Sequence, residues 1–146
     1  MRNKTRNNEL VARAFELLSS KEKSEYASNI FGKDGFIDKA YASQIAAFSV
    51  SVAMVGLKPT LAMYYEQGGA TVDTRNIIGI VAELLMLDGY DFAPEGDEYN
   101  LLSEKLFVYA MKHNSEKLRK DVIDNAVALK VVVRTFIKTK EDEKPA

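Results

Sequence analysis

The chain has no cysteine, and His113 is its single histidine. Without thiols it can form neither disulfides nor thiolate metal sites. With one histidine and no cysteine, nucleophile–base pairs and tetrahedral zinc sites are nearly excluded. His113 lies at the end of an expected helix, where it is better suited to interact with the last carbonyls than to act as a general base. The sequence therefore predicts no catalysis, no cofactor and no metal site.

Basic residues are absent from one stretch. Asp88 to Glu104 holds six acidic residues and no Lys or Arg. The spacing does not fit a calcium-binding EF-hand loop, because Tyr90 and Ala93 occupy the third position counted from Asp88 and Asp91. We expect a solvated loop or a docking surface for a basic partner. Its candidate interface residues are Asp88, Asp91, Glu95, Asp97 and Glu98.

Charge of either sign is absent from Ala40 to Leu57, eighteen residues in all. This length reaches the lower limit of a membrane-spanning helix, but serines, a glutamine and a glycine interrupt it. We therefore expect no membrane association. The apolar residues recur at helical spacing and continue most of the way round the helix, a pattern typical of a helix buried on several sides. The sequence predicts that the helix over 36–57 is the central and most buried element, with Phe48 in the core.

Gly56 and Pro59 predict a sharp junction after this helix, since glycine can adopt a left-handed conformation and proline suits the first turn of the next helix. No segment alternates over enough residues to predict a strand. The remaining helical patterns, with Ser115 as an N-cap, complete an all-α prediction: a compact bundle of about six helices around the buried central helix. The expected helices span 7–27, 36–57, 59–67, 71–88, 100–113 and 115–138.

The length of 146 residues predicts a single helical domain, 1–146, in which 139–146 is a polar, flexible tail. The basic N-terminus leads into a segment that Arg13 and Glu16 interrupt, so it does not resemble a signal peptide. With the absence of cysteine, this favours a cytoplasmic location.

The net charge of −1 hides a basic segment. Lys112 to Lys140 holds eight basic residues against three acidic ones. Lys130, Arg134 and Lys138 are spaced by four along the last helix, and Lys120 continues the row at its far end. Solvated basic stripes are common near helix C-termini, where cations favour the helix dipole. A row of this kind also suits an extended backbone of phosphates, so both interpretations stay open.

The segment Gly56-Leu57-Lys58-Pro59-Thr60-Leu61-Ala62-Met63-Tyr64, preceded by the apolar helix, resembles the small all-helical subunit of type III-B CRISPR effector complexes. The apolar helix with basic residues over 123–136 is similar to that family as well. The resemblance implies a non-catalytic protein that packs beside the backbone filament of an RNA-guided antiviral ribonucleoprotein. Cleavage in such a complex belongs to other subunits.

As partners the resemblance implies the other subunits of the complex, the guide RNA and the backbone of a single-stranded target RNA. In the complex the subunit is expected to stack into a filament, and in isolation to be a monomer. The expected RNA-binding residues are then Lys130, Arg134, Lys138 and Lys120. The alternative is a protein-only helical interaction or regulatory adaptor module.

Overall fold

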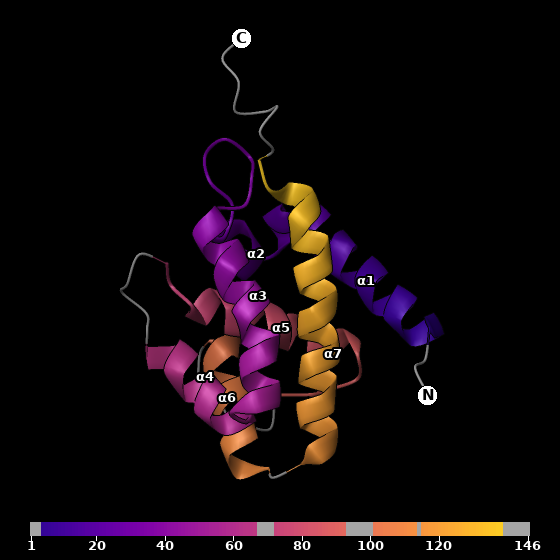
Figure 1. Ribbon diagram of the computed structural model, residues 1–146, viewed down its shortest axis with the longest axis vertical. Coiled ribbons are helices and arrows are strands. Elements are labelled where there is room, and N and C mark those ends of the chain that lie inside the picture. Colours follow the sequence, from indigo (N-terminus) through magenta and orange to yellow (C-terminus); the bar gives the residue numbers. More distant parts are fainter. Residues whose placement is uncertain (1–3, 67–71, 93–100, 114, 139–146) are drawn as a thin grey trace.

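The computed structural model describes residues 4–66, 72–92, 101–113 and 115–138, which form an all-α bundle without a strand in these ranges (Figure 1). This confirms the predicted fold class. The α-helices are α1 (Lys4–Ser19), α2 (Glu25–Asn29), α3 (Lys39–Met54), α4 (Leu57–Glu66), α5 (Arg75–Leu87), α6 (Leu102–Lys112) and α7 (Glu116–Val133), and two short 3₁₀-helices are η1 (Lys21–Lys23) and η3 (Arg134–Phe136).

The helix boundaries follow local chemistry. Gly56 adopts φ 119° between α3 and α4, and Pro59 lies in the first turn of α4, as predicted. The Ser115 hydroxyl accepts a hydrogen bond from the Leu118 backbone at 3.2 Å and caps α7, also as predicted. The predicted helix over 7–27 is wrong in its extent. It divides into α1, η1 and α2, because the Ser24 side chain caps a new helix by accepting from Ala27 N at 3.1 Å.

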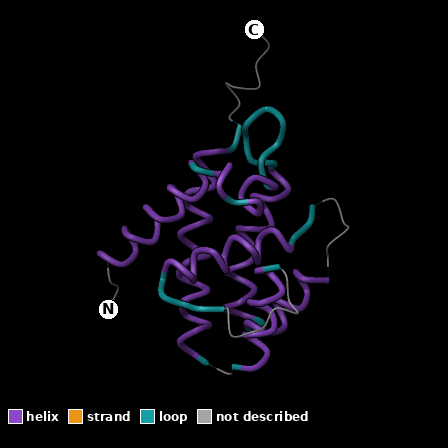
Figure 2. Tube along the Cα trace, turned by 180° about the vertical axis from the view of Figure 1, so that it is seen from behind, coloured by secondary structure: helices purple, strands orange, loops and turns teal. Residues whose placement is uncertain are grey.

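Helices α3 and α7 lie side by side and antiparallel, with α1 on the other flank of α7 (Figure 1). Arg119 of α7 donates to the Ala53 carbonyl at one end of this pair, and Ile37 N donates to the Phe136 carbonyl at 2.8 Å at the other. Seen from behind, the loop between α2 and α3 projects from the end of the bundle at which α7 finishes (Figure 2). This arrangement leaves one long side of both α3 and α7 at the surface.

The most buried helix is α5, so the prediction that the helix over 36–57 is the most buried is wrong. Nine of the thirteen residues of α5 are buried, against five of sixteen in α3. Helix α5 packs against α1, α2, α4, α6 and α7, whereas α3 packs mainly against α4 and α7. Gly79 admits the ring of Tyr26 so closely that a Cβ at this position would overlap it. Phe48 is nevertheless fully buried, as predicted.

None of the helices in the described ranges is both long enough and apolar enough to span a membrane.

Candidate nucleic-acid interface

Helix α7 has one buried face and one solvent-facing side. Its buried residues are Leu118, Asp121, Val122, Asn125, Ala126, Ala128, Leu129, Val132 and Val133. The outer side carries exposed Lys120, Val127 and Val131, with Val127 43% and Val131 48% exposed. The buried face fixes the rotation of the helix, because turning it would expose this apolar set to water. The outer side chains therefore have a defined direction.

The predicted basic row is shorter than expected. Lys130, partly buried, and exposed Arg134 lie one turn apart at the end of α7. The α-helix ends at Val133 and continues as the 3₁₀-helix η3, so partly buried Lys138 follows outside the helical register. The spacing by four thus places only Lys130 and Arg134 on one line, and the prediction of a helical row through Lys138 is wrong.

Lys120 occupies a different place on α7. It precedes Lys130 by ten residues, which corresponds to about 15 Å along the axis and a turn of about 80°. Lys120 lines a groove of about 580 Å³ between α1 and α7, together with Arg6, Asp124 and several apolar side chains. The structure therefore separates Lys120 from the Lys130–Arg134 pair.

The basic residues of α7 fall into two groups. Lys117 pairs with Asp121 at 2.7 Å, and Arg119 pairs with Glu116 at 2.7 Å. In contrast, the four predicted RNA-binding residues form no ion pair with any carboxylate in the described part of the chain: Lys120, Lys130, Arg134 and Lys138. Their charges are left for solvent or for an external anion.

The end of the bundle next to Arg134 carries two further charged residues, Asp38 and Lys39. The Ile37–Phe136 hydrogen bond brings the start of α3 against η3, so Lys39 enters this end of the molecule as well. Asp38 lies beside Lys39, but its carboxylate caps α3 by accepting from Ala40 N at 2.9 Å.

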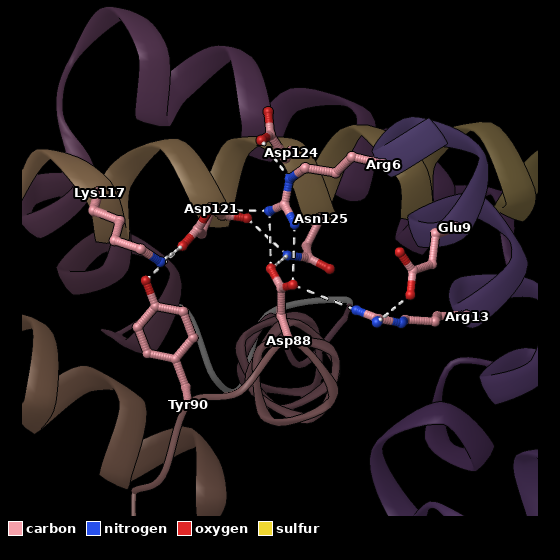
Figure 3. A network of polar contacts seen from close by, with 9 residues as sticks. All are labelled: Arg6, Glu9, Arg13, Asp88, Tyr90, Lys117, Asp121, Asp124 and Asn125. Carbon is pink, nitrogen blue, oxygen red and sulfur yellow. Dashed lines mark hydrogen bonds and ion pairs between the residues drawn. The ribbon is translucent and has the colours of Figure 1, made fainter. Parts of the chain in front are cut away.

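A second polar cluster lies on the opposite, inner side of α7 and is centred on Arg6 (Figure 3). The Arg6 guanidinium donates to both carboxylate oxygens of Asp88, at 3.0 and 2.9 Å. It also donates to Asp121 at 3.0 Å and to Asp124 at 3.4 Å. A bidentate pair of this kind is strong and directional. It ties α1 to the end of α5 and to the middle of α7.

The carboxylates of this cluster have additional donors. Asp88 accepts from Arg13 at 3.4 Å and from the Asn125 side chain at 3.3 Å. Asp121 accepts from the Tyr90 hydroxyl and from Lys117, each at 2.7 Å (Figure 3). Every cation and carboxylate drawn in Figure 3 thus has a partner within the chain. The cluster therefore links α1, α5 and α7, and its carboxylates are occupied by protein donors.

The pKa shifts in the Arg6 cluster agree with its role as a link between helices. The hydrogen bond from Arg6 lowers the pKa of Asp88 against the opposing effect of burial. The charge of Arg6, the hydrogen bond from Asn125 and the charge of Arg13 lower this pKa further. The pKa of Arg6 is raised, mainly by the hydrogen bond to Asp88. Burial, followed by the hydrogen bond to Asp121, raises the pKa of Tyr90. All three shifts favour the states shown, with a charged ion pair and a protonated tyrosine.

Asp88, predicted as part of an acidic docking surface, is bound within the fold, and its role as an interface residue stays a prediction. This residue caps the end of α5, and its side chain is only 12% exposed because Arg6 and Arg13 cover it. Asp91 is exposed, and its role as an interface residue stays a prediction. Glu95, Asp97 and Glu98 lie outside the described residues.

The remaining candidates for chemistry are limited. His113 ends α6, and its ring stacks on that of Tyr109 with centroids 4.1 Å apart. Within the described ranges, no group of three or more His, Cys, Asp or Glu side chains has the arrangement of a metal site.

Sequence reasoning missed the Arg6 cluster because Arg6 lies 82 to 118 residues from the carboxylates that it binds. One signal was present. Asp121 falls on the same helical face as Leu118, Val122 and Leu129, and a carboxylate in such a position needs a partner.

Compared with protein families, with curated proteins and with solved structures, the chain matches none.

Proposed function

We propose that the protein is a non-catalytic small subunit of a type III-B CRISPR ribonucleoprotein, in which it packs beside the backbone filament and helps hold guide or target RNA. The observation that carries the proposal is the division of the α7 cations. Lys117 and Arg119 are neutralised within the chain, whereas Lys130 and Arg134 lie side by side without a carboxylate partner in the described residues.

Such a pair suits phosphates rather than bases. Two cations one helical turn apart are about 6 Å from each other along the axis, close to the spacing of successive phosphates on an extended strand. Arg134 is exposed and Lys130 is partly exposed beside it, so a strand of phosphates can approach both cations from solvent. Binding is then independent of sequence and strengthened by repetition along a filament.

The absence of catalysis is part of the same proposal. The chain has one histidine and no cysteine, and the carboxylates of the Arg6 cluster are occupied by Arg6, which supports a role without catalysis. The protein contributes positioning, and the chemistry belongs to its neighbours. A cytoplasmic location follows from this role.

The test is reconstitution. The purified chain is mixed with the other subunits of a type III-B complex from the same source and with guide RNA, and the mixture is separated by size-exclusion chromatography. We expect the chain to co-elute with the complex in stoichiometric amount. Elution of all the chain as free protein, while the other subunits assemble, would contradict the proposal.

The alternative function, a protein-only helical adaptor, is favoured by a different observation: the outer side of α3 is exposed and uncharged. A chain that fails to enter the ribonucleoprotein but binds a protein through this side would support the adaptor.

A further inference from the structure

The sequence contains two Asp-Gly pairs, Asp34-Gly35 and Asp88-Gly89, whose carboxylates have different surroundings. In such a pair the glycine nitrogen can approach the aspartate side chain closely, because glycine has no Cβ to obstruct it. Both glycines have a left-handed backbone, with φ 86° and 101°, and an aromatic residue follows each pair. Local backbone and sequence therefore do not distinguish the two pairs, whereas the rest of the fold does.

The Asp88 carboxylate is restrained by Arg6 (Figure 3). Its side chain is 12% exposed, and both oxygens accept hydrogen bonds from the Arg6 guanidinium, at 3.0 and 2.9 Å. Attack by a backbone nitrogen requires a protonated carboxyl group, whose hydroxyl can leave as water. The hydrogen bond from Arg6 lowers the pKa of Asp88 and so favours the unreactive carboxylate. Asp88-Gly89 is therefore protected within the fold.

The Asp34 carboxylate has no such restraint. Asp34 is exposed in the loop between α2 and α3 (Figure 2), and it forms no ion pair with a cation in the described ranges. Its Oδ1 accepts a hydrogen bond from Phe36 N at 3.1 Å. This bond turns the side chain back toward the peptide that follows it. That is the direction required for contact between the carboxyl carbon and the Gly35 nitrogen.

We propose that Asp34 is a modification site, at which the aspartate isomerises spontaneously to isoaspartate. The Gly35 nitrogen attacks Cγ of the protonated side chain and forms a C–N bond, while the carboxyl hydroxyl and the amide proton leave as water. The five-membered succinimide ring then takes up one water. Opening at the main-chain carbonyl carbon gives isoaspartate, and opening at Cγ restores aspartate. One water is released and one is consumed, so the reaction needs no further reactant.

The hydrogen bonds of the loop limit both the rate and the consequence of this reaction. Gly35 N donates to the Gly32 carbonyl at 3.0 Å, and this bond must open before the nitrogen can attack. Isoaspartate adds one atom to the main chain, so the turn cannot close in the same way afterwards. The base of the loop is closed separately by the bond from Asp38 N to the Ile30 carbonyl at 3.2 Å. We therefore expect the bundle to stay folded.

This inference goes beyond the proposed function and does not depend on it. It concerns the α2–α3 loop and the Arg6 cluster, and both belong to the isolated chain. Neither RNA nor a partner subunit is needed for the test.

The first test compares the two sites in the native chain. The full chain is incubated at slightly acidic pH, and isoaspartate is counted by methylation with a protein isoaspartate methyltransferase and labelled S-adenosylmethionine. Trypsin places Asp34 in the fragment 34–39 and Asp88 in the fragment 76–105. Isoaspartate should form at least about tenfold faster at Asp34, since a hydrogen bond to a charged group is strong enough to lower the reactive population by this factor.

The unfolded chain in urea is the matched control. Arg6 no longer binds Asp88 there, so the two sites should react at similar rates. In the folded protein Arg6→Gln should raise the rate at Asp88 and leave that at Asp34 unchanged, with circular dichroism as the check of folding. Asp34→Glu keeps the charge but requires a six-membered ring, which closes much more slowly. It should remove the signal from the fragment 34–39.

Equal rates at Asp34 and Asp88 in the native chain would overturn the inference. So would a native chain without isoaspartate at Asp34 when the unfolded chain accumulates it at both sites, because the Gly35–Gly32 hydrogen bond would then protect the pair. A methylation signal in the fragment 34–39 that Asp34→Glu leaves unchanged would assign the reaction to Asp38 and would overturn it as well.

Discussion

Helices α3 and α5 are similar in composition and differ in position. Both are dominated by uncharged, mostly apolar residues, yet α5 is enclosed by five other helices and α3 lies at the surface on one side. Apolar residues all round a helix show that it needs contacts in every direction. In α5 these contacts come from the same chain. In α3 one side stays exposed, with Val50 51% and Met54 81% exposed.

The largest expected effect comes from placing the same charge on each helix. Ile80→Glu buries a carboxylate in α5, where Ile80 is 0% exposed, without a partner. The cost is about 5 kcal/mol or more, comparable with the whole stability of a small domain. Val50→Glu on the outer side of α3 should leave folding intact. Circular dichroism and urea unfolding at low micromolar concentration measure both, and a folded Ile80→Glu protein would contradict the central position of α5.

A smaller difference in the free energy of unfolding is expected between substitutions on the two sides of α3. Phe48→Ala removes a fully buried ring that meets the Tyr64 ring edge-on, with centroids 5.0 Å apart. It should cost about 3–5 kcal/mol. Met54→Ala, on the exposed side, should change the free energy of unfolding by about 0.5 kcal/mol or less. Equal losses for the two variants would show that α3 has no free side.

The sequence predicted the all-α class and the helix junctions because those depend on local chemistry. Gly56, Pro59 and Ser115 act within a few residues of their own position. The prediction that α3 is the most buried helix is wrong, because the spacing of apolar residues does not show which sides of a helix the rest of the chain covers. The i,i+4 spacing of Lys117 and Asp121 could have predicted their ion pair, and Lys130 has no acid at such a spacing. The sequence could not show that Asp121 also binds Arg6, which is 115 residues away.

The Arg6 cluster provides the next prediction, which depends on pH. Arg6→Gln leaves the carboxylates of Asp88 and Asp121 partly buried without their shared cation, at a cost of about 1–3 kcal/mol at pH 7. The pKa of Asp88 is lowered in the fold, so its contribution is complete above the pKa of the unfolded chain, about 3.9, and is lost as the pH falls through the folded value.

The difference between wild type and Arg6→Gln should therefore be largest at neutral pH and shrink below about pH 4. Urea unfolding across this range measures it. Arg134→Gln makes the same change of charge at an exposed residue without an ion pair in the described chain, and its effect should stay within about 0.5 kcal/mol at every pH. A pH-independent loss for Arg6→Gln would show that packing, and not the ion pair, stabilises this junction.

The most direct test of the proposed function is the salt dependence of RNA binding by the reconstituted complex. Single-stranded RNA is titrated at several salt concentrations with wild type, with Lys130→Ala/Arg134→Ala and with the control Lys105→Ala on α6. If each of the two cations contacts one phosphate, the slope of log K against log salt should lose about 0.7 per contact, about 1.4 for the double variant. The control should keep the wild-type slope. An unchanged slope for the double variant, with assembly intact, would contradict a phosphate-binding role for Lys130 and Arg134.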